Sequence, residues 1–446
     1  MASQPTMDLE GDVLRPEDDG YDAARAVFNG MIDRRPLAIA RCHEASDVAR
    51  GIAYARRFDL PLSVRSGGHN VAGSAVCDDG IMLDLSAMKH LDVDAGDRTA
   101  QAGPGLLLGD LDRATQKQGF AVPLGVMSKT GIAGLTLGGG LGWLNGRYGL
   151  ACDSLLGAEL VSGDGEVLHV TAEHHADLLW GLRGGGGNFG VVTSFTYRLH
   201  PVGPVLAGWL SYPSSMAADA IRFHHQFLAD APDELSTSVS LGVDSAGAPV
   251  ASIGVCWCGD HDEGMVALRS LREFGPPAQD TIVPTSYVAL QSAPDANFPT
   301  GRLHYWKSGY LRDLTDAAVE TLLAVASAVP PGVSGIGLQG LRGAASRVPV
   351  DATAFPHRAE QYDFLILAQW ADPAESTRHV TWARESFAAM QPHLENAVYV
   401  NNLGSEEGDR VRAAYGPNHQ RLAELKRRYD PANVFRLNQN VAPAGP

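Results

Sequence analysis

The chain lacks any hydrophobic run approaching the roughly 18 residues that a membrane-spanning helix needs, and it is poor in cysteine. Residues 1–10 carry neither the basic start nor the apolar centre of a secretory signal peptide. The cysteines are odd in number and mostly far apart, which does not suit a framework of disulfides. We therefore expect packing thiols in a cytoplasmic protein. They are Cys42, Cys77, Cys152, Cys256 and Cys258. The close pair at 256 and 258 offers only two ligands, so no metal site is predicted.

Positive charge is also scarce. The chain has 35 Lys and Arg against 51 Asp and Glu, which gives a net charge of −16 over 446 residues. A net acidic protein is a poor match for the phosphates of nucleic acids or anionic lipids, so we expect no nucleic-acid and no membrane partner. The densest basic run, residues 426–428, is predicted to be the solvated face of a short amphipathic helix. The length favours two large domains.

Apolar periodicity divides the chain into two regions near Pro204. The first region alternates strands with helices, and the second has strands with amphipathic helices between them, which suggests one antiparallel sheet backed by helices. The chain is therefore predicted to be of the α+β class. Strands are predicted at residues 36–42, 60–65, 80–85, 99–102, 158–162, 166–170, 191–199, 205–212, 235–243, 250–258 and 362–370. Helices are predicted at residues 46–55, 106–119, 176–183, 216–228, 263–274, 316–328, 374–390 and 412–428.

Glycine is in excess, with 50 residues, and it gathers in loops. The string Gly185-x-Gly187-x-x-Gly190 matches the dinucleotide fingerprint, but that fingerprint needs a strand before it and a helix after it. Here the predicted order is reversed, which argues against a nicotinamide-dependent dehydrogenase.

Two other glycine segments suit a phosphate-bearing ligand better. A predicted strand delivers the turn Ser66-Gly67-Gly68, whose backbone N–H groups can form an anion-binding nest with His69 at its rim. The segment 125–142 is glycine-rich along its length, so its backbone can approach an extended ligand closely. The alternatives are an ordinary turn histidine and a tight helix-on-sheet contact. Together the two segments favour an extended anionic ligand.

Four motifs carry a resemblance to a known family. They are Arg65–His69, the segment 131–150, the run 180–190, and the tail 429–440 with its Tyr-Asp-Pro and Asn-Gln-Asn elements. In this order they resemble the berberine bridge enzyme-like branch of the vanillyl-alcohol-oxidase flavoproteins, which have an FAD-binding domain of the p-cresol methylhydroxylase type. The resemblance implies a two-domain FAD-binding fold. Residues 1–203 would form the FAD domain in two subdomains, 204–400 the substrate domain, and 401–446 a segment that returns to the FAD domain.

The resemblance also implies the cofactor and its ligands. FAD would be held by one covalent bond, from His69 to the 8α-methyl group of the flavin, because a neutral imidazole nitrogen is a nucleophile. The flavin would carry the redox chemistry and the protein would position it. The residues implied around FAD, besides His69, are Arg65, Ser66, Gly67, Gly68, Asn70, Gly73, Gly125, Ser128, Gly131, Thr136, Gly139, Gly142, Gly190, Val192, Asn438 and Asn440.

Three departures from the family pattern matter. Met127 stands where many relatives have a cysteine that makes a second flavin bond, and a thioether cannot make it, so a single bond is expected. Asn401-Asn402 replaces the Asn-Tyr pair of many sugar-oxidising relatives and is similar to an amine-oxidising member. Arg347 falls where plant-type members carry a catalytic glutamate. Cys152 belongs to a different motif and is predicted to be a core residue.

The reaction is expected to be hydride transfer from a small-molecule alcohol or amine to the flavin, with reoxidation by O2 to give hydrogen peroxide. An alcohol needs a base, whereas a neutral amine supplies its own lone pair. The candidate catalytic residues are Asn401, Asn402, Tyr399, Lys307, His357 and Arg347. Trp306 and Trp370 are predicted to be core residues. The protein is expected to be a monomer or homodimer.

Other functions fit the same motifs. A flavin-dependent dehydrogenase, or a tailoring enzyme of secondary metabolism that closes a ring oxidatively, would share them. So would a non-catalytic protein that binds a flavin or another small ligand.

Overall fold

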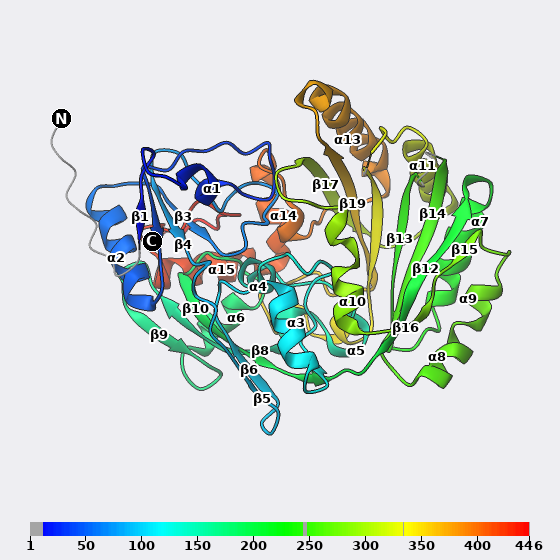
Figure 1. Ribbon diagram of the computed structural model, residues 1–446, viewed down its shortest axis with the longest axis horizontal. Coiled ribbons are helices and arrows are strands. Elements are labelled where there is room, and N and C mark those ends of the chain that lie inside the picture. The colour runs from blue at the N-terminus through cyan, green and yellow to red at the C-terminus, as the bar shows by residue number, and fades with distance from the viewer. Residues whose placement is uncertain (1–11, 244–247, 333, 446) are drawn as a thin grey trace.

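The computed structural model describes residues 12–243, 248–332 and 334–445, and Figure 1 shows its elements as two adjoining halves. Residues 1–10, on which the signal-peptide expectation depends, lie outside the described residues. Helices and mainly antiparallel sheets occur together in both halves, so the α+β class is confirmed. The division at residues 203 and 400 remains a prediction.

The first subdomain of the N-terminal half is a small mixed sheet. Its strand order is β1-β2-β4-β3, in which β2, β4 and β3 are parallel and β1 is antiparallel to β2. Its strands are β1 (Val13–Leu14), β2 (Ala38–Arg41), β3 (Leu62–Arg65) and β4 (Ile81–Asp84). Helix α2 (Ala45–Arg57) packs its buried Val48 and Ile52 into the core of this sheet. The short helix α1 (Tyr21–Arg25) precedes β2.

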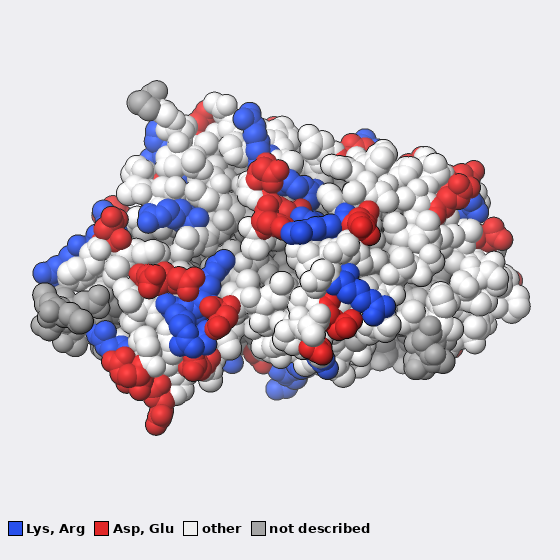
Figure 2. All heavy atoms as spheres, turned by 90° about the horizontal axis from the view of Figure 1, so that it is seen from above, with Lys and Arg blue, Asp and Glu red and all other residues white. Residues whose placement is uncertain are grey.

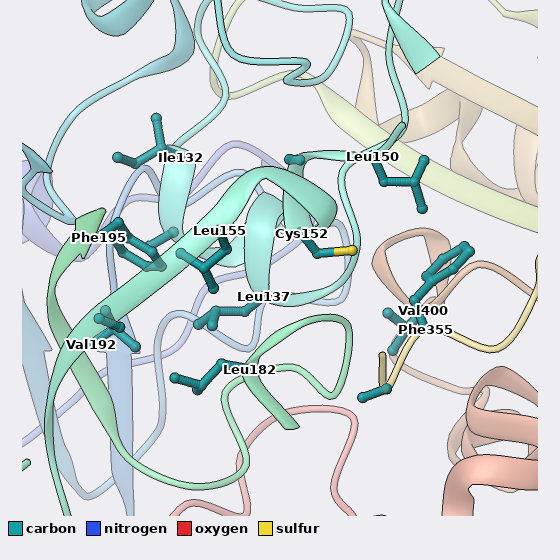
Figure 3. Close-up of a cluster of buried hydrophobic side chains, with 14 of the residues drawn as sticks. Ile132, Leu137, Leu150, Cys152, Leu155, Leu182, Val192, Phe195, Phe355 and Val400 are labelled. Carbon is teal, nitrogen blue, oxygen red and sulfur yellow. The ribbon is translucent and has the colours of Figure 1, made fainter. Parts of the chain in front are cut away.

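The second subdomain is a five-stranded antiparallel sheet with the order β5-β6-β10-β8-β9. Its strands are β5 (Leu91–Asp94), β6 (Thr99–Ala102), β8 (Leu155–Val161), β9 (Val167–Val170) and β10 (Val191–Arg198). Nearby helices are α3 (Leu108–Gln116), α4 (Ile132–Leu137), α5 (Asn145–Tyr148) and α6 (Ala176–Leu182). A two-stranded ladder joins β7 (Phe120–Ala121) to β11 (His200–Pro201). The core under α4 includes Cys152, which is fully buried as predicted (Figure 3).

The second half is one large antiparallel sheet, as predicted, with the order β15-β12-β14-β13-β18-β19-β17 and with β16 also paired to β12. Its strands are β12 (Val205–Pro213), β13 (Leu235–Val243), β14 (Pro249–Trp257), β15 (Gln279–Asp280), β16 (Val283–Thr285), β17 (Leu303–Leu311), β18 (Gly335–Leu341) and β19 (Gln361–Trp370). Helices α7 (Ser214–Leu228), α11 (Asp316–Ala326) and α13 (Ser376–Met390) pack on this sheet.

Because side chains alternate between the two faces of a strand, each strand of this sheet contributes to two environments. Val239, Leu338 and Phe364 belong to the apolar core shared with the helices. Their strand neighbours of the opposite parity, such as Gln339 and Asp363, lie directly opposite each other in the ladder and line the cavity described below. The sheet therefore forms one wall of the site.

Two predicted helices are broken in the structure. Residues 263–274 fall in α8 (His261–Ala267) and α9 (Arg269–Glu273), and residues 412–428 fall in α14 (Val411–Tyr415) and α15 (His419–Tyr429). Gly416-Pro417 separates the second pair, because proline cannot continue the preceding helix. Two further short helices are α10 (Tyr287–Ser292) and α12 (Ala344–Arg347). In Figure 1 the C-terminal helix α15 lies back among elements of the N-terminal half.

The basic run at residues 426–428 is only partly a solvated face. Arg427 and Arg428 are exposed, but Lys426 is fully buried and pairs with Asp430 at 2.7 Å, which corrects the prediction for that residue. Elsewhere on the surface, Figure 2 shows acidic and basic side chains interspersed on the face it presents. Among the described residues no helix is both long and apolar enough to cross a bilayer, and no cluster could hold a metal ion.

Candidate functional site

A cavity of about 1100 Å³ lies between the glycine loops of the N-terminal half and the large sheet. This volume is at the upper end of ligand pockets, which usually span roughly 300–1000 Å³, so the cavity suits a ligand larger than a typical small substrate. Its walls come from stretches that lie far apart in the sequence. They include the loop after β3, the segment 125–143, the loop before β10, strands β13, β18 and β19 of the large sheet, and the segments 399–402 and 435–439.

The two glycine loops meet through their backbones. A Cβ atom on Gly67 would lie 2.6 Å from the Cα of Gly131, and one on Gly131 would lie 2.5 Å from the N of Gly67. Real Cβ contacts are never that short, so only glycine permits this approach. Gly68 has a φ of 65°, a left-handed conformation that favours glycine. The contact brings the predicted nest and the start of α4 to the same end of the cavity.

His69 lines the cavity beside this contact. Its Nε2 atom lies 3.3 Å from the Sδ of Met127, and its ring is stacked on Phe28 with centroids 3.9 Å apart. Burial lowers the pKa of His69 to about 4, so the imidazole is neutral at neutral pH. A neutral ring keeps a lone pair on one nitrogen, which is the form that acts as a nucleophile.

The C-terminal tail forms another part of the wall. Asn438 lines the cavity and donates its Nδ2 to the carbonyl of Gly187 at 2.9 Å, while the Oδ1 atoms of Asn438 and Asn440 are buried without a partner. Two orphaned acceptors suit a ligand that offers N–H or O–H groups. The buried Lys426 holds the tail in place by donating to the carbonyls of Asn188 and Phe435 at 2.7 and 2.9 Å.

The residues present fit FAD. Gly134 has no heavy atom within 4 Å of an added Cβ, and Gly187 has its nearest at 4.0 Å, so both leave open room along the cavity that a side chain would fill. The loop at residues 66–70 would hold phosphate oxygens through backbone N–H groups, because no Lys or Arg occurs among the described lining residues. The orphaned Oδ1 of Asn438 would face a hydrogen-bond donor of the cofactor.

A carboxylate that sequence reasoning missed stands in the opposite wall. Asp363 lies on β19, is buried, and accepts a hydrogen bond from the Nδ2 of Asn402 to its Oδ2 at 2.8 Å, while its Oδ1 has no partner. Burial raises the pKa of Asp363 to about 7, opposed by the Asn402 hydrogen bond. It is the only acidic residue among the described lining residues. A lone Asp within the apolar run of residues 361–370 was the available signal.

Tyr399 and Asn401 also line the cavity, but both are engaged with the loop opposite them. The hydroxyl of Tyr399 accepts from the backbone N of Gly140 and from the Nδ2 of Asn401, both at 2.8 Å. Asn401 Nδ2 also donates to the carbonyl of Leu135 at 3.1 Å. Burial raises the pKa of Tyr399 well above its usual value, so this phenol stays protonated. These two residues fasten the glycine segment to the segment 399–402.

Three predicted catalytic candidates lie outside the cavity lining, and their catalytic roles remain predictions. The Nζ of Lys307 lies 3.3 Å from a carboxylate oxygen of Glu407. Lys307 directly follows Trp306 on β17, so its side chain points to the opposite face of the sheet from that of Trp306, which lines the cavity. His357 donates its Nε2–H to the carbonyl of Ala414 at 2.8 Å. Arg347 is exposed on α12 and forms an ion pair with Asp233, away from the cavity lining.

The two tryptophans differ from each other. Trp306 lines the cavity, contrary to the expectation that it is a core residue, whereas Trp370 is buried and stacked on His379 at 4.9 Å. The large sheet turns alternate side chains of β17 to different faces. This places Trp306 on the cavity side.

The predicted cofactor ligands fall into two groups, and their roles remain predictions. Those that line the cavity are Ser66, Gly67, Gly68, His69, Asn70, Gly125, Gly131, Gly190, Val192 and Asn438. Those that do not are Arg65, Gly73, Ser128, Thr136, Gly139, Gly142 and Asn440. Members of the second group support the loops instead. Arg65 lies 3.9 Å from Asp84, and Ser128 donates to Asp295 at 2.6 Å.

Comparison with protein families finds two matches that bracket the site. An FAD binding domain matches residues 36–171, and a domain described as berberine and berberine like matches residues 398–442. The first contains both glycine loops and His69. The second contains residues 401 and 402 and the tail with Asn438.

Individual relatives match over nearly the whole chain. It is 33% identical to the (R)-6-hydroxynicotine oxidase of Paenarthrobacter nicotinovorans over 98% of both chains, and 30% identical to an FAD-linked oxidoreductase of Dictyostelium discoideum over 98% of this chain and 95% of that one. The crystal structure of 6-hydroxy-D-nicotine oxidase from Arthrobacter nicotinovorans superposes with a TM-score of 0.91 at 33% identity over 100% of both chains. Berberine bridge enzyme from Eschscholzia californica, at 21% identity, has the same fold, with a TM-score of 0.88 over 98% of this chain and 97% of that one.

Proposed function

Because the chain belongs to the berberine bridge enzyme-like family of FAD-linked oxidoreductases, we propose that it is an oxidase with FAD covalently bound through His69. Its substrate would be a small-molecule amine or alcohol, and O2 would take the electrons to give hydrogen peroxide. The observation that carries the proposal is the Asp363 carboxylate, with a free Oδ1, opposite the glycine loops in a cavity whose other described lining residues include no Lys, Arg, Asp or Glu.

The environment of His69 supports the covalent bond. The ring is neutral because burial lowers its pKa to about 4, so its lone pair is available at physiological pH. Met127 occupies the neighbouring position at 3.3 Å, and its thioether has no S–H proton to lose, so a bond to the flavin would leave a charged sulfonium instead of a neutral thioether link. One bond, to His69 alone, is therefore the proposed state.

The chain's own residues would manage the proton of the substrate. FAD, when bound, supplies a hydride acceptor. Asp363 would accept the substrate O–H or N–H proton at Oδ1, since its pKa of about 7 matches a general base working near neutral pH. Asn402 would orient the carboxylate by donating to Oδ2. Leu365 and Leu367, one and two pleats further along the same face of β19, would exclude water from the reacting atoms.

The cavity favours an amine with an apolar body over a sugar. A sugar presents many hydroxyl groups and needs many polar partners, whereas the sheet wall offers leucines, Trp306 and small residues around a single carboxylate. Asn402 donates a hydrogen bond to that carboxylate. It stands where many sugar-oxidising relatives have a tyrosine, and its amide offers no phenol to act as a base. A relative at 33% identity is named for a hydroxynicotine, which is an amine. Residues 238–242 and 335–337 would accept the body of the substrate.

The first test is acid precipitation of the purified yellow protein, followed by identification of the flavin-bearing tryptic peptide. We expect the colour in the pellet, on a peptide that contains His69 and not Met127. Oxygen uptake and peroxide release should then be measured with a panel of aryl-alkyl amines, aryl alcohols and hexoses. Amines should be turned over and hexoses should not.

The alternatives give distinct results. Turnover of an amine with an artificial electron acceptor but not with O2 would indicate a dehydrogenase. A bound flavin that no substrate reduces would indicate a non-catalytic flavin-binding protein. Colour in the supernatant after acid treatment would refute the bond to His69.

A further inference from the structure

A short segment near the N-terminus, Phe28–Gly30, connects the two halves beside His69. We call it the N-terminal strap. On one side the N of Phe28 donates to the carbonyl of Gly68 at 2.9 Å, and Asn29 Nδ2 donates to the carbonyl of Val71 at 2.8 Å. These bonds fasten the strap to the loop that carries His69.

The strap is fastened equally to the start of β17 in the large sheet. The N of Gly30 donates to the carbonyl of Arg302 at 2.7 Å, and the N of Gly301 donates to the carbonyl of Phe28 at 3.0 Å. Asn29 and His304 exchange two further bonds of 3.0 Å each between side chain and backbone. A Cβ on Gly30 would lie 2.3 Å from the O of Gly301. The close backbone approach fixes the position of the strap.

Phe28 is the middle ring of a three-ring stack. Its ring lies 3.9 Å from that of His69 with an interplanar angle of 16°, and 4.3 Å from that of His304 with an angle of 24°. Trp306 closes the edge of the stack, with its ring centroid 6.4 Å from that of Phe28. Phe28 and His304 are both buried, with 4% and 1% of their surface exposed.

The far ring of the stack is held by packing and not by hydrogen bonds. Neither nitrogen of His304 has a partner, although both are buried. Burial, with a smaller contribution from His69, lowers the pKa of His304 to about 3, so this ring is uncharged. A buried N–H without a partner costs stability, and the stack is retained despite that cost. Its consequence is a flat, rigid support behind His69.

We propose that Phe28 is a positioning residue for flavin attachment, holding the imidazole of His69 in the orientation that bonds the 8α carbon. This inference rests on the proposed covalent link. Stacking leaves the ring edge of His69, with its nitrogens, directed along the plane of the stack, and prevents rotation about the Cβ–Cγ bond. A reacting nitrogen displaced by about 1 Å can lower a rate by roughly 100-fold.

The attachment balances with O2 as oxidant. One C–H bond of the 8α-methyl group and the N–H bond of neutral His69 are broken, and one C–N bond forms. The two protons and two electrons released pass to O2, which becomes H2O2. No base other than solvent is required by this balance, so the contribution of the chain is the placement and neutrality of the imidazole.

The test compares Phe28→Leu with Phe274→Leu. Phe274 is a matched control because its ring is also stacked, on Phe223 at 4.2 Å, within the substrate half. The measured quantity is the ratio of acid-stable to acid-released flavin in the purified protein. We expect Phe28→Leu to lower this ratio at least tenfold while FAD remains bound, and Phe274→Leu to leave it unchanged. Phe28→Tyr keeps the ring and should retain the bond.

A pH dependence separates positioning from general loss of structure. Without Phe28 the imidazole is hydrated and its pKa returns toward 6.5. The flavin that is bound noncovalently in Phe28→Leu should therefore become acid-stable faster during incubation at pH 8 than at pH 6. The uncharged Met127 contacts the ring, the uncharged His304 lies on the far side of Phe28, and Arg65 behind the loop is engaged with Asp84. A difference between the two pH values is therefore assigned to His69.

The outcomes are distinguishable. An acid-released flavin in the wild type overturns both the covalent link and this inference. An acid-stable wild type with an equal ratio in Phe28→Leu overturns the inference alone. If Phe28→Leu does not fold, His304→Leu removes the support from the far side of the same ring, and it should lower the ratio in the same direction. An unchanged ratio there would also overturn the inference.

Discussion

At the scale of single residues, Asp363 gives the clearest pH dependence. Its pKa is raised to about 7 by burial, so the proton-accepting form predominates only above that pH. We predict that the rate of flavin reduction by an amine rises with pH, about tenfold per unit below 7, and levels off above it. Anaerobic stopped-flow bleaching of the flavin colour, repeated with amines of different basicity, measures this. If the rising part of the pH–rate profile shifts with the basicity of the amine, the group that titrates is the substrate amine and not Asp363.

Asp363→Asn should abolish the rise of the flavin-reduction rate with pH below 7. It should also slow reduction by roughly 10²–10⁴-fold, the usual contribution of a general base. The same change should not destabilise the fold. A carboxyl whose folded pKa lies above its unfolded value loses stability as the pH rises from about 4 to 7, so the uncharged amide should melt at the same temperature or higher at pH 8. A slow variant that also melts much lower would indicate damaged structure rather than a lost base.

At this scale the sequence predicts a site residue when a short stretch of neighbouring residues marks it, and fails when its place depends on distant strands. The approach of Gly67 to Gly131 needs glycine on both loops, and glycine clusters are visible in the sequence. Asp363 gives almost no such signal, because its place in the cavity wall comes from the register of β19 against β18 and its orientation from the amide of Asn402. Lys307 and His357 have suitable chemistry, but strand parity and a backbone partner remove them from the cavity.

At the scale of elements, strands with an apolar alternation were predictable and strand β18 was not. Three of its seven residues, Gly335, Gly337 and Gly340, are glycines, which weaken strand propensity and carry no side chain to show a period. The sheet pairs β18 on both edges, with β13 and β19. Those long-range ladders supply what the local sequence lacks.

Helix α15 supports the site through a buried ion pair. Lys426 and Asp430 are 0% and 1% exposed, and Lys426 also holds the carbonyls of Asn188 and Phe435. Burial lowers the pKa of Lys426, an effect that the pairing with Asp430 opposes. We predict that Lys426→Met leaves an uncompensated buried carboxylate and destabilises the protein by about 3–5 kcal/mol.

Thermal unfolding measures this effect, with Arg427→Met as the control. Arg427 is the exposed neighbour on the same helix, and its substitution should change stability by less than about 0.5 kcal/mol. Equal melting temperatures for the two variants would show that Lys426 is not needed for stability. A destabilised Lys426→Met should also release its flavin more readily when combined with His69→Ala, because the tail with Asn438 loses its anchor.

At the scale of the whole molecule, the cavity is assembled from segments that lie hundreds of residues apart. Asn188 meets the backbone of residues 439 and 441, and Asn29 meets His304. Periodicity predicts elements and indicated the two regions, but it does not predict which elements face each other. The returning tail was therefore indicated only by the family resemblance. The strap at Phe28–Gly30 has no periodicity or glycine cluster that marks it, and it emerged only from the structure.

This assembly makes bound FAD a stabiliser of the whole fold. In His69→Ala the flavin can dissociate, and only the folded chain brings the distant walls of the cavity together. A ligand that binds only the folded state adds about 2.7 kcal/mol at 100 times its dissociation constant. We therefore predict that FAD raises the melting temperature of His69→Ala by about 3–6 °C, growing with the logarithm of its concentration. NAD at the same concentration is the control and should have no effect, since the glycine string at 184–190 is preceded by α6 and followed by β10, the reverse of the dinucleotide order. A melting temperature that FAD leaves unchanged would show that the cavity does not bind the cofactor.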